Sequence, residues 1–189
     1  MEKIIVYDFD GTIYDGDSTI DFYKFCIKND KKLLKYLPKQ IYAYLMYACK
    51  LRSKEYFKEK FFLFLKNIND VNELVEEFWK ENAKNIKKWY NIKNHNNDVI
   101  ISASPEFLLR PICDKLGVKL LIATIVDEKN GQFLSKNCKG NEKVRRLNET
   151  IKNYKIQDFY SDSKTDIYLA KLAVKSYFVN KNKITEWKI

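Results

Sequence analysis

Short apolar runs alternate with helical periodicity along most of this chain. Buried-strand patterns, rich in β-branched and aromatic residues, occur at residues 4–7, 99–101, 119–126, 156–160 and 176–179. Helical patterns separate the later runs, at residues 105–116, 141–153 and 163–172. This alternation predicts an α/β fold, with a Rossmann-like parallel sheet and helices on both of its faces.

The strand pattern disappears between residues 16 and 90. Apolar and aromatic residues recur there at helical spacing, and Pro38 and short polar stretches divide the block into four or five helices. Ser18, Ser53 and Asp70 are expected to be their N-caps. We therefore predict two domains: an α/β core made of residues 1–15 and 91–189, and an inserted all-helical domain of residues 16–90.

Turn residues mark several boundaries in the second half of the chain. Ser104 is expected to cap a helix that has Pro105 as its first residue, and Gly117 is expected to end that helix. Residues 127–131 predict a hairpin turn before a short apolar run.

The charge of the chain is compatible with more than one partner. There are 35 Lys and Arg residues against 25 Asp and Glu, a net charge of +10, which would suit nucleic acid or an anionic membrane surface. Lysine is spread along the whole chain, however, and no nucleic-acid-binding motif occurs, so we expect no nucleic-acid partner. Composition does not determine the oligomeric state.

Cysteine and histidine usage excludes several kinds of site. The four cysteines are far apart in the sequence and His95 is the only histidine, which excludes a metal site or catalytic triad built on several histidines. No signal-peptide pattern precedes the first strand. The longest apolar run, residues 41–49, is about half the ~20 residues that span a bilayer. We expect a cytoplasmic protein with reduced thiols.

Polar side chains follow three of the predicted strands. Asp8 and Asp10 come directly after the first strand, Ser102 after the second, and Asp162 after the fourth. Residues two apart in an extended chain point the same way, so Asp8 and Asp10 repel each other unless a cation or a proton intervenes. Ligands of parallel sheets bind beyond the carboxyl ends of the strands. If these strands are neighbours, the polar groups meet in one crevice.

Oxygen ligands and cations in this crevice would suit a phosphate ester. Asp162 and Asp166 are four residues apart and share a helix face, and with Asp8 and Asp10 they make a set of hard ligands suited to Mg²⁺. One carboxylate could attack phosphorus and a second could transfer protons. Each residue also has a purely structural interpretation, such as Asp162 forming a turn.

Phosphate oxygens need donors of their own. Ser102, Ala103 and the start of the helix that follows them are candidates. Lys143 could neutralise the remaining phosphate charge, and Lys139 competes for that role four residues earlier.

Four stretches resemble the motifs of the haloacid dehalogenase superfamily. They are Asp8-Phe9-Asp10-Gly11-Thr12, Ser102-Ala103-Ser104-Pro105, Lys139-Gly140-Asn141-Glu142-Lys143 and Ser161-Asp162-Ser163-Lys164-Thr165-Asp166. Their order and spacing cover nearly the whole chain. The Ser-Ala-Ser-Pro sequence and the helical block after the first motif are similar to the phosphoserine-phosphatase-like branch.

This resemblance implies a phosphatase that works through an aspartyl phosphate. It implies that Asp8 is the nucleophile and Asp10 the general acid and base. It implies further that Mg²⁺ is held by Asp8, the Asp10 backbone carbonyl and Asp162 with support from Asp166, that Ser102, Ala103 and Lys143 bind phosphate, and that the helical block is a cap over the site.

The substrate implied is a small phosphorylated metabolite. Phosphoserine is an alternative, but Asp17 and Thr165 replace a Glu and an Asn of that enzyme, and Arg52 is the single arginine of the helical block. Asp17 could contact substrate or cap the helix after it. A phospholipid phosphatase acting at a membrane is another alternative, because residues 36–51 form a Tyr-rich amphipathic stretch; those aromatics could instead pack inside the cap. A metal-binding scaffold with a decayed site is the non-enzymatic alternative.

Overall fold

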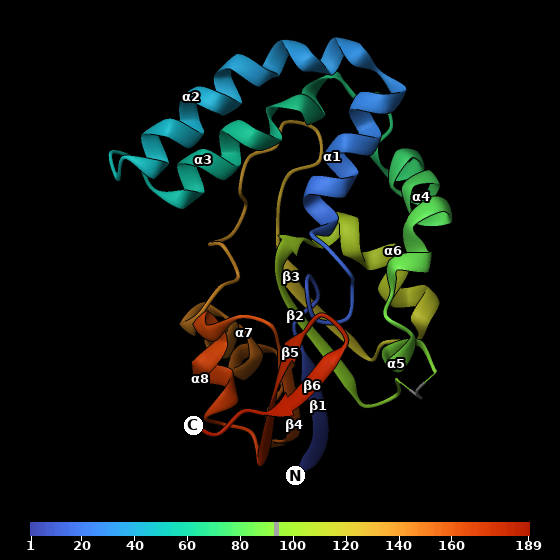
Figure 1. Cartoon of the computed structure of the whole chain (residues 1–189), viewed down its shortest axis with the longest axis vertical. Helices are drawn as coiled ribbons and strands as arrows, with labels where there is room; N and C mark the ends of the chain where they lie inside the picture. Colours follow the sequence, from blue (N-terminus) through green and yellow to red (C-terminus); the bar gives the residue numbers. More distant parts are fainter. Residues whose placement is uncertain (93–94) are drawn as a thin grey trace.

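The computed structural model describes residues 1–92 and 95–189, and within them the chain forms a six-stranded sheet flanked by helices (Figure 1). The strands are β1 (Glu2–Tyr7), β2 (Asp98–Pro105), β3 (Leu120–Thr124), β4 (Tyr154–Ser161), β5 (Lys175–Asn180) and β6 (Lys183–Glu186). Their order is β3-β2-β1-β4-β5-β6, with β1 to β5 parallel and β6 antiparallel to β5. The predicted α/β class is confirmed.

Strand β1 lies at the centre of the sheet. It pairs in parallel with β2 on one side and with β4 on the other, so that Tyr7 lies opposite both Ile100 and Tyr160. The three strands predicted to end in polar residues are therefore neighbours, and their carboxyl ends lie at one edge of the sheet.

Alternation along the strands divides the apolar side chains between two cores. Ile4 and Val6 of β1 face one core, and Tyr7 faces the other. Helix α6 (Glu106–Leu116) covers the Tyr7 face. Helices α7 (Asn141–Thr150) and α8 (Ile167–Ala170) cover the opposite face, as Figure 1 shows. Because helices cover both faces, β1 and β2 read as nearly continuous apolar runs.

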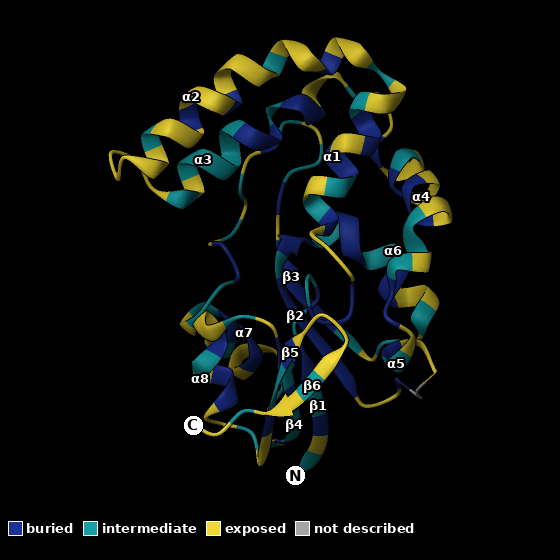
Figure 2. Ribbon diagram, in the orientation of Figure 1, coloured by how far each residue is buried: buried dark blue, intermediate teal, exposed yellow. Residues whose placement is uncertain are grey.

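Most of the helical insertion stands beyond the carboxyl ends of the strands, whereas its last helix lies beside the sheet (Figure 1), where Tyr90 packs against Tyr7 of β1. Its helices are α1 (Ser18–Asn29), α2 (Leu37–Ala48), α3 (Lys54–Phe61), α4 (Val71–Asn82) and α5 (Lys88–Asn91), with 3₁₀ segments at Lys31–Tyr36, Phe62–Asn67 and Ala83–Asn85. In Figure 2 the inner sides of α1 and α4 are buried, whereas α2 is exposed over most of its length. The four or five helices predicted are present.

Aromatic side chains join the insertion to the sheet. Phe22 of α1 and Phe78 of α4 pack edge to face, and both belong to the same buried cluster as Tyr7 and Phe9 at the end of β1. Trp79 donates from Nε1 to the Leu108 carbonyl of α6 at 2.6 Å. The insertion therefore shares its core with one face of the sheet.

Two predicted N-caps are confirmed and two are wrong. Ser53 and Asp70 accept backbone N–H groups at the starts of α3 and α4. Asp17, not Ser18, caps α1, because its carboxylate accepts the Ile20 N–H at 3.0 Å. Ser104 does not cap α6: it is still part of β2, Pro105 stands at the N-cap position, and the helix begins at Glu106.

Other boundaries differ for local reasons. Gly117 ends α6 with φ +72°, as predicted. The strand at residues 119–126 is shorter than expected, and beyond Thr124 only an isolated bridge joins Val126 to Phe133. The helix at residues 163–172 is a 3₁₀ turn, Lys164–Asp166, followed by α8. Strand β6 was not predicted, because it is a largely exposed edge strand without an apolar run.

The loop at residues 127–133 rests against the insertion. Gly131 has φ +76°, and a Cβ there would lie 2.4 Å from the Phe62 carbonyl oxygen. The Phe133 ring contacts the Phe62 ring with centroids 6.2 Å apart. No helix within the described parts of the chain is long and apolar enough to cross a membrane.

The close approach at Gly131 can be separated from its backbone conformation. Gly117 also has a positive φ but has no atom within 4 Å of its ideal Cβ position. We expect Gly117→Ala to lower the free energy of unfolding by about 1 kcal/mol, and Gly131→Ala to lower it by about 1–3 kcal/mol more, because the methyl group overlaps Phe62. Urea unfolding measures both. Equal losses would contradict the contact between loop and insertion.

Candidate active site

A cavity of about 390 Å³ lies where the ends of β1 and β2 meet the helical insertion. The predicted site residues that line it are Asp8, Asp10, Asp17, Ser102, Ala103, Lys139, Lys143 and Asp166. Thr165 lines it as well, while Asp162 does not. From the insertion come Thr19, Ile20, Lys54, Phe57, Lys58, Phe61 and Phe62. Segments far apart in the sequence therefore enclose one chamber.

Asp8 is held by the backbone pairing at the end of β1. Its N–H donates to the Tyr160 carbonyl at 2.9 Å, which extends the pairing with β4 by one residue. Its Oδ1 accepts the Phe9 N–H and the Lys143 ammonium, each at 2.9 Å. Burial raises the pKa of Asp8, and the Lys143 charge counteracts that rise.

Lys143 bridges two carboxylates. Its Nζ lies 2.9 Å from Asp8 Oδ1 and 2.7 Å from Asp166 Oδ2, and its side chain is almost fully buried. Ser161 Oγ donates to the same Asp166 oxygen at 2.9 Å. Burial alone would lower the pKa of Lys143, but the two carboxylates raise it above its ordinary value. Lys139 lines the same cavity but forms no ion pair with Asp8 in the described residues, and which of the two lysines binds phosphate stays a prediction.

Asp10 is oriented by hydrogen bonds to both of its oxygens. Oδ1 accepts the Ser18 N–H at 2.6 Å at the start of α1, and Oδ2 accepts the Ser104 hydroxyl at 2.5 Å. Ser104 Oγ in turn accepts the Thr19 hydroxyl at 3.0 Å. Burial raises the pKa of Asp10 to about 6, with a contribution from the negative charge of Asp17. A carboxyl group of that pKa can give and take a proton near neutral pH.

Asp17 both caps α1 and lines the cavity. The sequence allowed two roles for Asp17. The capping role is confirmed, and a contact with substrate stays a prediction.

The turn after Asp10 brings Asp162 close to β1. Gly11 has φ +71°, and a Cβ there would lie 2.1 Å from Asp162 Oδ2. Thr12 Oγ1 accepts the Asp162 N–H at 3.0 Å. Lys87 donates to the Gly11 carbonyl at 2.5 Å and to the Lys181 carbonyl at 2.7 Å, which fixes the turn from the other side. A glycine is required at position 11 for both steric and conformational reasons.

The acidic side chains offer oxygen ligands, but not a ready-made cluster. In the described residues, no three His, Cys, Asp or Glu side chains are gathered closely enough to hold a metal ion by themselves. Asp166 is engaged by Lys143 and Ser161. Burial raises the pKa values of Asp8 and Asp162, so a cation between them would be favourable. The donor chemistry fits Mg²⁺; the four-aspartate site stays a prediction.

Lys58 was not identified from the sequence. Its Nζ donates to the Ala103 carbonyl at 2.9 Å and to Asn137 Oδ1 at 2.8 Å, which connects α3 to β2. Burial lowers the pKa of Lys58 to about 8, and the nearby charge of Lys54 adds to that effect. The spacing of Lys54 and Lys58, one turn apart and beside Phe57 and Phe61, is the signal that could have revealed this face of α3.

Ser104 was interpreted as a helix cap, and its bond to Asp10 was missed. The signal was a second hydroxyl at the end of the same strand, in Ser102-Ala103-Ser104. Ser102 itself accepts the Ser104 N–H at 3.1 Å.

The single histidine and the cysteines lie outside this site. His95 Nδ1 lies 2.8 Å from Asp98 Oδ2, and the ring stacks on Tyr90 with centroids 4.3 Å apart. All four cysteines are free thiols, and three of them are buried.

Comparisons with known proteins agree with this geometry. The family model of haloacid dehalogenase-like hydrolases matches residues 5–171. A histidinol-phosphatase of Neisseria meningitidis serogroup C (strain 8013) is 30% identical over 94 residues. That match covers 43% of this chain and 42% of the relative, so the chain spans less than half the length of the relative it matches.

Solved structures share the fold. A protein of unknown function from Bordetella pertussis Tohama I superposes with a TM-score of 0.78 at 18% identity, over 93% of this chain and 89% of that one. A phosphoserine phosphohydrolase-like protein from Francisella tularensis subsp. tularensis SCHU S4 gives a TM-score of 0.55 at 17% identity, over 92% and 85%.

The two cavity lysines can be distinguished by unfolding. Lys143→Met leaves Asp8 and Asp166 buried without their cation, so we expect a loss of about 3–5 kcal/mol near neutral pH. Burial already raises the folded-state pKa of Asp8 above its unfolded value, and this substitution removes the ammonium charge that counteracts the rise. The penalty is therefore absent at low pH and grows as the pH rises from about 5 to about 7.5.

The matched control is Lys139→Met, in the same cavity but without an ion pair in the described residues. We expect it to change the free energy of unfolding by less than about 0.5 kcal/mol. Urea unfolding in EDTA at the two pH values measures both variants. Similar losses, or a pH-independent loss for Lys143→Met, would contradict the bridge.

Proposed function

Because the chain belongs to the haloacid dehalogenase-like hydrolase family, we propose that it is a Mg²⁺-dependent phosphatase that hydrolyses a small phosphate monoester through an aspartyl phosphate on Asp8. One observation carries this proposal: the buried Lys143 ammonium joins Asp8 to Asp166 at the wall of a cavity that also holds Asp10. The histidinol-phosphatase named above, which is similar over part of its length, supports a phosphate ester as the substrate class.

The cavity supplies the groups that a phosphate needs. Ser102 and the backbone at Ala103 lie at the end of β2 beside Asp8, and Lys143 carries the charge that complements a phosphate oxygen. When it binds, phosphate would share the Lys143 ammonium with Asp8. The same ammonium would hold the nucleophile and the phosphoryl group together.

The first step transfers the phosphoryl group to the protein. A carboxylate oxygen of Asp8 attacks phosphorus, and the bond from phosphorus to the ester oxygen breaks. Asp10 gives a proton to the leaving oxygen, so an alcohol departs. Its hydrogen bonds to Ser18 and Ser104 hold the carboxyl group in position for this transfer.

The second step frees the nucleophile. Asp10, now ionised, takes a proton from water, and the water oxygen attacks the phosphorus of the aspartyl phosphate. The bond from phosphorus to the Asp8 oxygen breaks, which releases inorganic phosphate and restores both carboxyl groups. One residue thus serves as acid and then as base, as microscopic reversibility requires.

The metal would be held by oxygen ligands at the ends of β1 and β4. We assign this role to Asp8, Asp162 and the Asp10 backbone carbonyl, with Asp166 orienting Lys143. A bound Mg²⁺ supplies positive charge that offsets the negative charge of the phosphoryl group. The Thr12 and Gly11 contacts described above hold Asp162 beside the turn that carries this carbonyl.

The helical insertion of residues 16–90 would act as the cap of this site. Phe57 and Phe61 of α3 line the cavity opposite the aspartates, where they exclude water, and Lys58 connects this helix to β2. Aromatic walls suit the organic part of a small metabolite.

Serine phosphate is the less favoured substrate. Asp17 and Thr165 both line the cavity and keep the difference from phosphoserine phosphatase noted in the sequence. A scaffold with a decayed site is disfavoured because the predicted catalytic side chains are present and hydrogen-bonded.

Removal of the nucleophile tests the mechanism. We expect Asp8→Asn to reduce Mg²⁺-supported hydrolysis of p-nitrophenyl phosphate by more than about 10³-fold, because an amide cannot form the phosphoryl ester. The control is Asp114→Asn, an exposed change on α6, which should keep wild-type activity. Full turnover by Asp8→Asn would exclude the mechanism. EDTA should stop the wild-type reaction and added Mg²⁺ should restore it.

Lys58 tests the cap. We expect Lys58→Met to lower kcat/KM for p-nitrophenyl phosphate by about 10-fold, because α3 loses both of its hydrogen bonds to the sheet side of the cavity. The matched control is Lys66→Met, an exposed position on the outer part of the insertion. Steady-state kinetics measures both. An unchanged kcat/KM for Lys58→Met would show that the contact does not contribute to closure.

A further inference from the structure

Helix α2 is apolar, yet it buries a polar residue. Of its twelve residues, Leu37–Ala48, only Gln40 and Ala43 are buried. The Gln40 amide donates to the Phe61 carbonyl at 2.9 Å and accepts the Tyr23 hydroxyl. These bonds satisfy buried polar groups and so fix the rotation of the helix about its axis. The apolar side chains of α2 have to face elsewhere.

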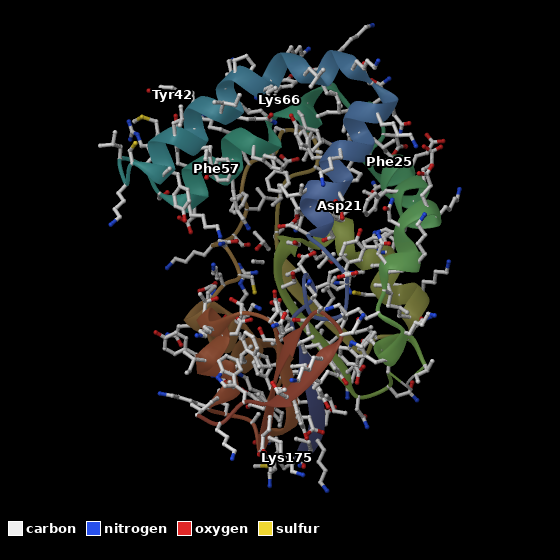
Figure 3. All side chains as sticks on the ribbon, in the orientation of Figure 1. Asp21, Phe25, Tyr42, Phe57, Lys66 and Lys175 are labelled. Atoms are coloured by element: carbon white, nitrogen blue, oxygen red, sulfur yellow. The ribbon has the colours of Figure 1, made fainter. Side chains whose placement is uncertain are left out.

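Most of these side chains face solvent. Ile41, Tyr42, Tyr44 and Leu45 are each half exposed or more, at 50–58% of their surface. Leu37 and Tyr47 near the two ends of the helix are exposed as well, and so are Leu34 before it and Leu51 after it. Figure 3 shows Tyr42 at the outer edge of the molecule. We call these eight exposed side chains, between Leu34 and Leu51, the α2 face. If these aromatic residues only packed inside the insertion, they would not be exposed in this way.

The same segment concentrates the charge of the protein. Between Asp30 and Glu55 lie seven of the 35 Lys and Arg residues and none of the 25 acidic ones, so this segment holds seven of the ten net positive charges. Six of the seven, all except Lys54, are exposed. In the described residues none of these six forms an ion pair with a carboxylate.

A groove of about 450 Å³ crosses the α2 face between α2 and α3. It is lined by Pro38, Lys39, Tyr42, Tyr56, Lys60 and Leu63. A groove that combines two lysines with two tyrosines suits an anionic headgroup that stands among apolar chains.

We propose that the α2 face binds an anionic lipid surface. Aliphatic and tyrosine side chains on one face, flanked by lysines and free of acids, are typical of helices that lie in the membrane interface. A second copy of the chain is disfavoured as the occupant, because a two-fold contact would bring two segments of charge +7 together. The proposal does not rest on the proposed phosphatase function.

The position of the face leaves the cavity open. No residue of α2 lines the cavity; the insertion lines it with residues of α1 and α3 and with Phe62. Helix α3 therefore lies between the α2 face and the cavity. Binding would hold the protein at the surface without covering the site.

Sedimentation with vesicles tests the proposal on the whole chain. We expect the wild-type protein to sediment with vesicles of equal parts phosphatidylcholine and phosphatidylglycerol, and not with phosphatidylcholine alone. Tyr42→Ser with Leu45→Ser, and separately Lys35→Gln with Lys39→Gln, should each reduce partitioning by about 10-fold or more. All four positions are exposed, so circular dichroism melting should show intact folds.

Matched changes elsewhere provide the controls. Leu134→Ser with Leu172→Ser, and Lys171→Gln with Lys175→Gln, alter equally exposed side chains outside the face and should leave partitioning unchanged. Asp8→Asn should sediment like the wild type, which separates this proposal from the catalytic one.

Three results would overturn the proposal. One is absence of sedimentation with the anionic vesicles. Another is sedimentation that neither pair of α2 substitutions reduces. The third is a wild-type dimer, seen by light scattering, that the Tyr42→Ser and Leu45→Ser pair dissociates, because the face would then serve a second copy.

Discussion

The buried bridge from Lys143 to Asp8 and Asp166 is the interaction on which the site depends. It joins the end of β1, the first turn of α7 and the turn after β4, three segments that are up to 158 residues apart at Asp8 and Asp166. A buried ion pair contributes little net stability, because desolvation offsets the attraction. The bridge acts instead by fixing position. Separating these groups would leave a buried charge without a partner, which costs free energy, so the three segments are held in one arrangement.

The helical insertion and the ends of the strands together enclose the cavity. Asp10 is held by Ser18 at the start of α1 and by Ser104 at the end of β2, so one carboxyl group joins the insertion to the core. Lys58 makes a second connection, from α3 to the Ala103 carbonyl of β2 and to Asn137. Since the insertion also shares its aromatic core with one face of the sheet, closure of the cavity is a consequence of packing as well as of polar contacts.

Local rules predicted several helix ends correctly, missed the start of α1 by one residue because Asp17 caps it, and failed at Ser104, where a distant group competed. Ser53, Asp70 and Gly117 fulfil their capping roles because only neighbouring backbone groups are involved. Ser104 looks like an equally good cap, but Asp10, 94 residues away, takes its hydroxyl and β2 continues through it. Periodicity predicted the helices of the insertion, yet it could not show that Gln40 would face inward and turn the apolar side of α2 toward solvent.

The sequence by itself determined the α/β class, the inserted helices and most of the candidate site residues, because strand ends and turn residues follow local patterns. The prediction of one crevice required β1, β2 and β4 to be neighbours, and the strand order of the sheet shows that they are. Tertiary structure alone placed Lys143, and not Lys139, against Asp8, brought Lys58 and Ser104 to the cavity, and left α2 exposed. These outcomes depend on contacts between residues tens of positions apart. The periodicity of one segment cannot predict which distant residue will pack against it.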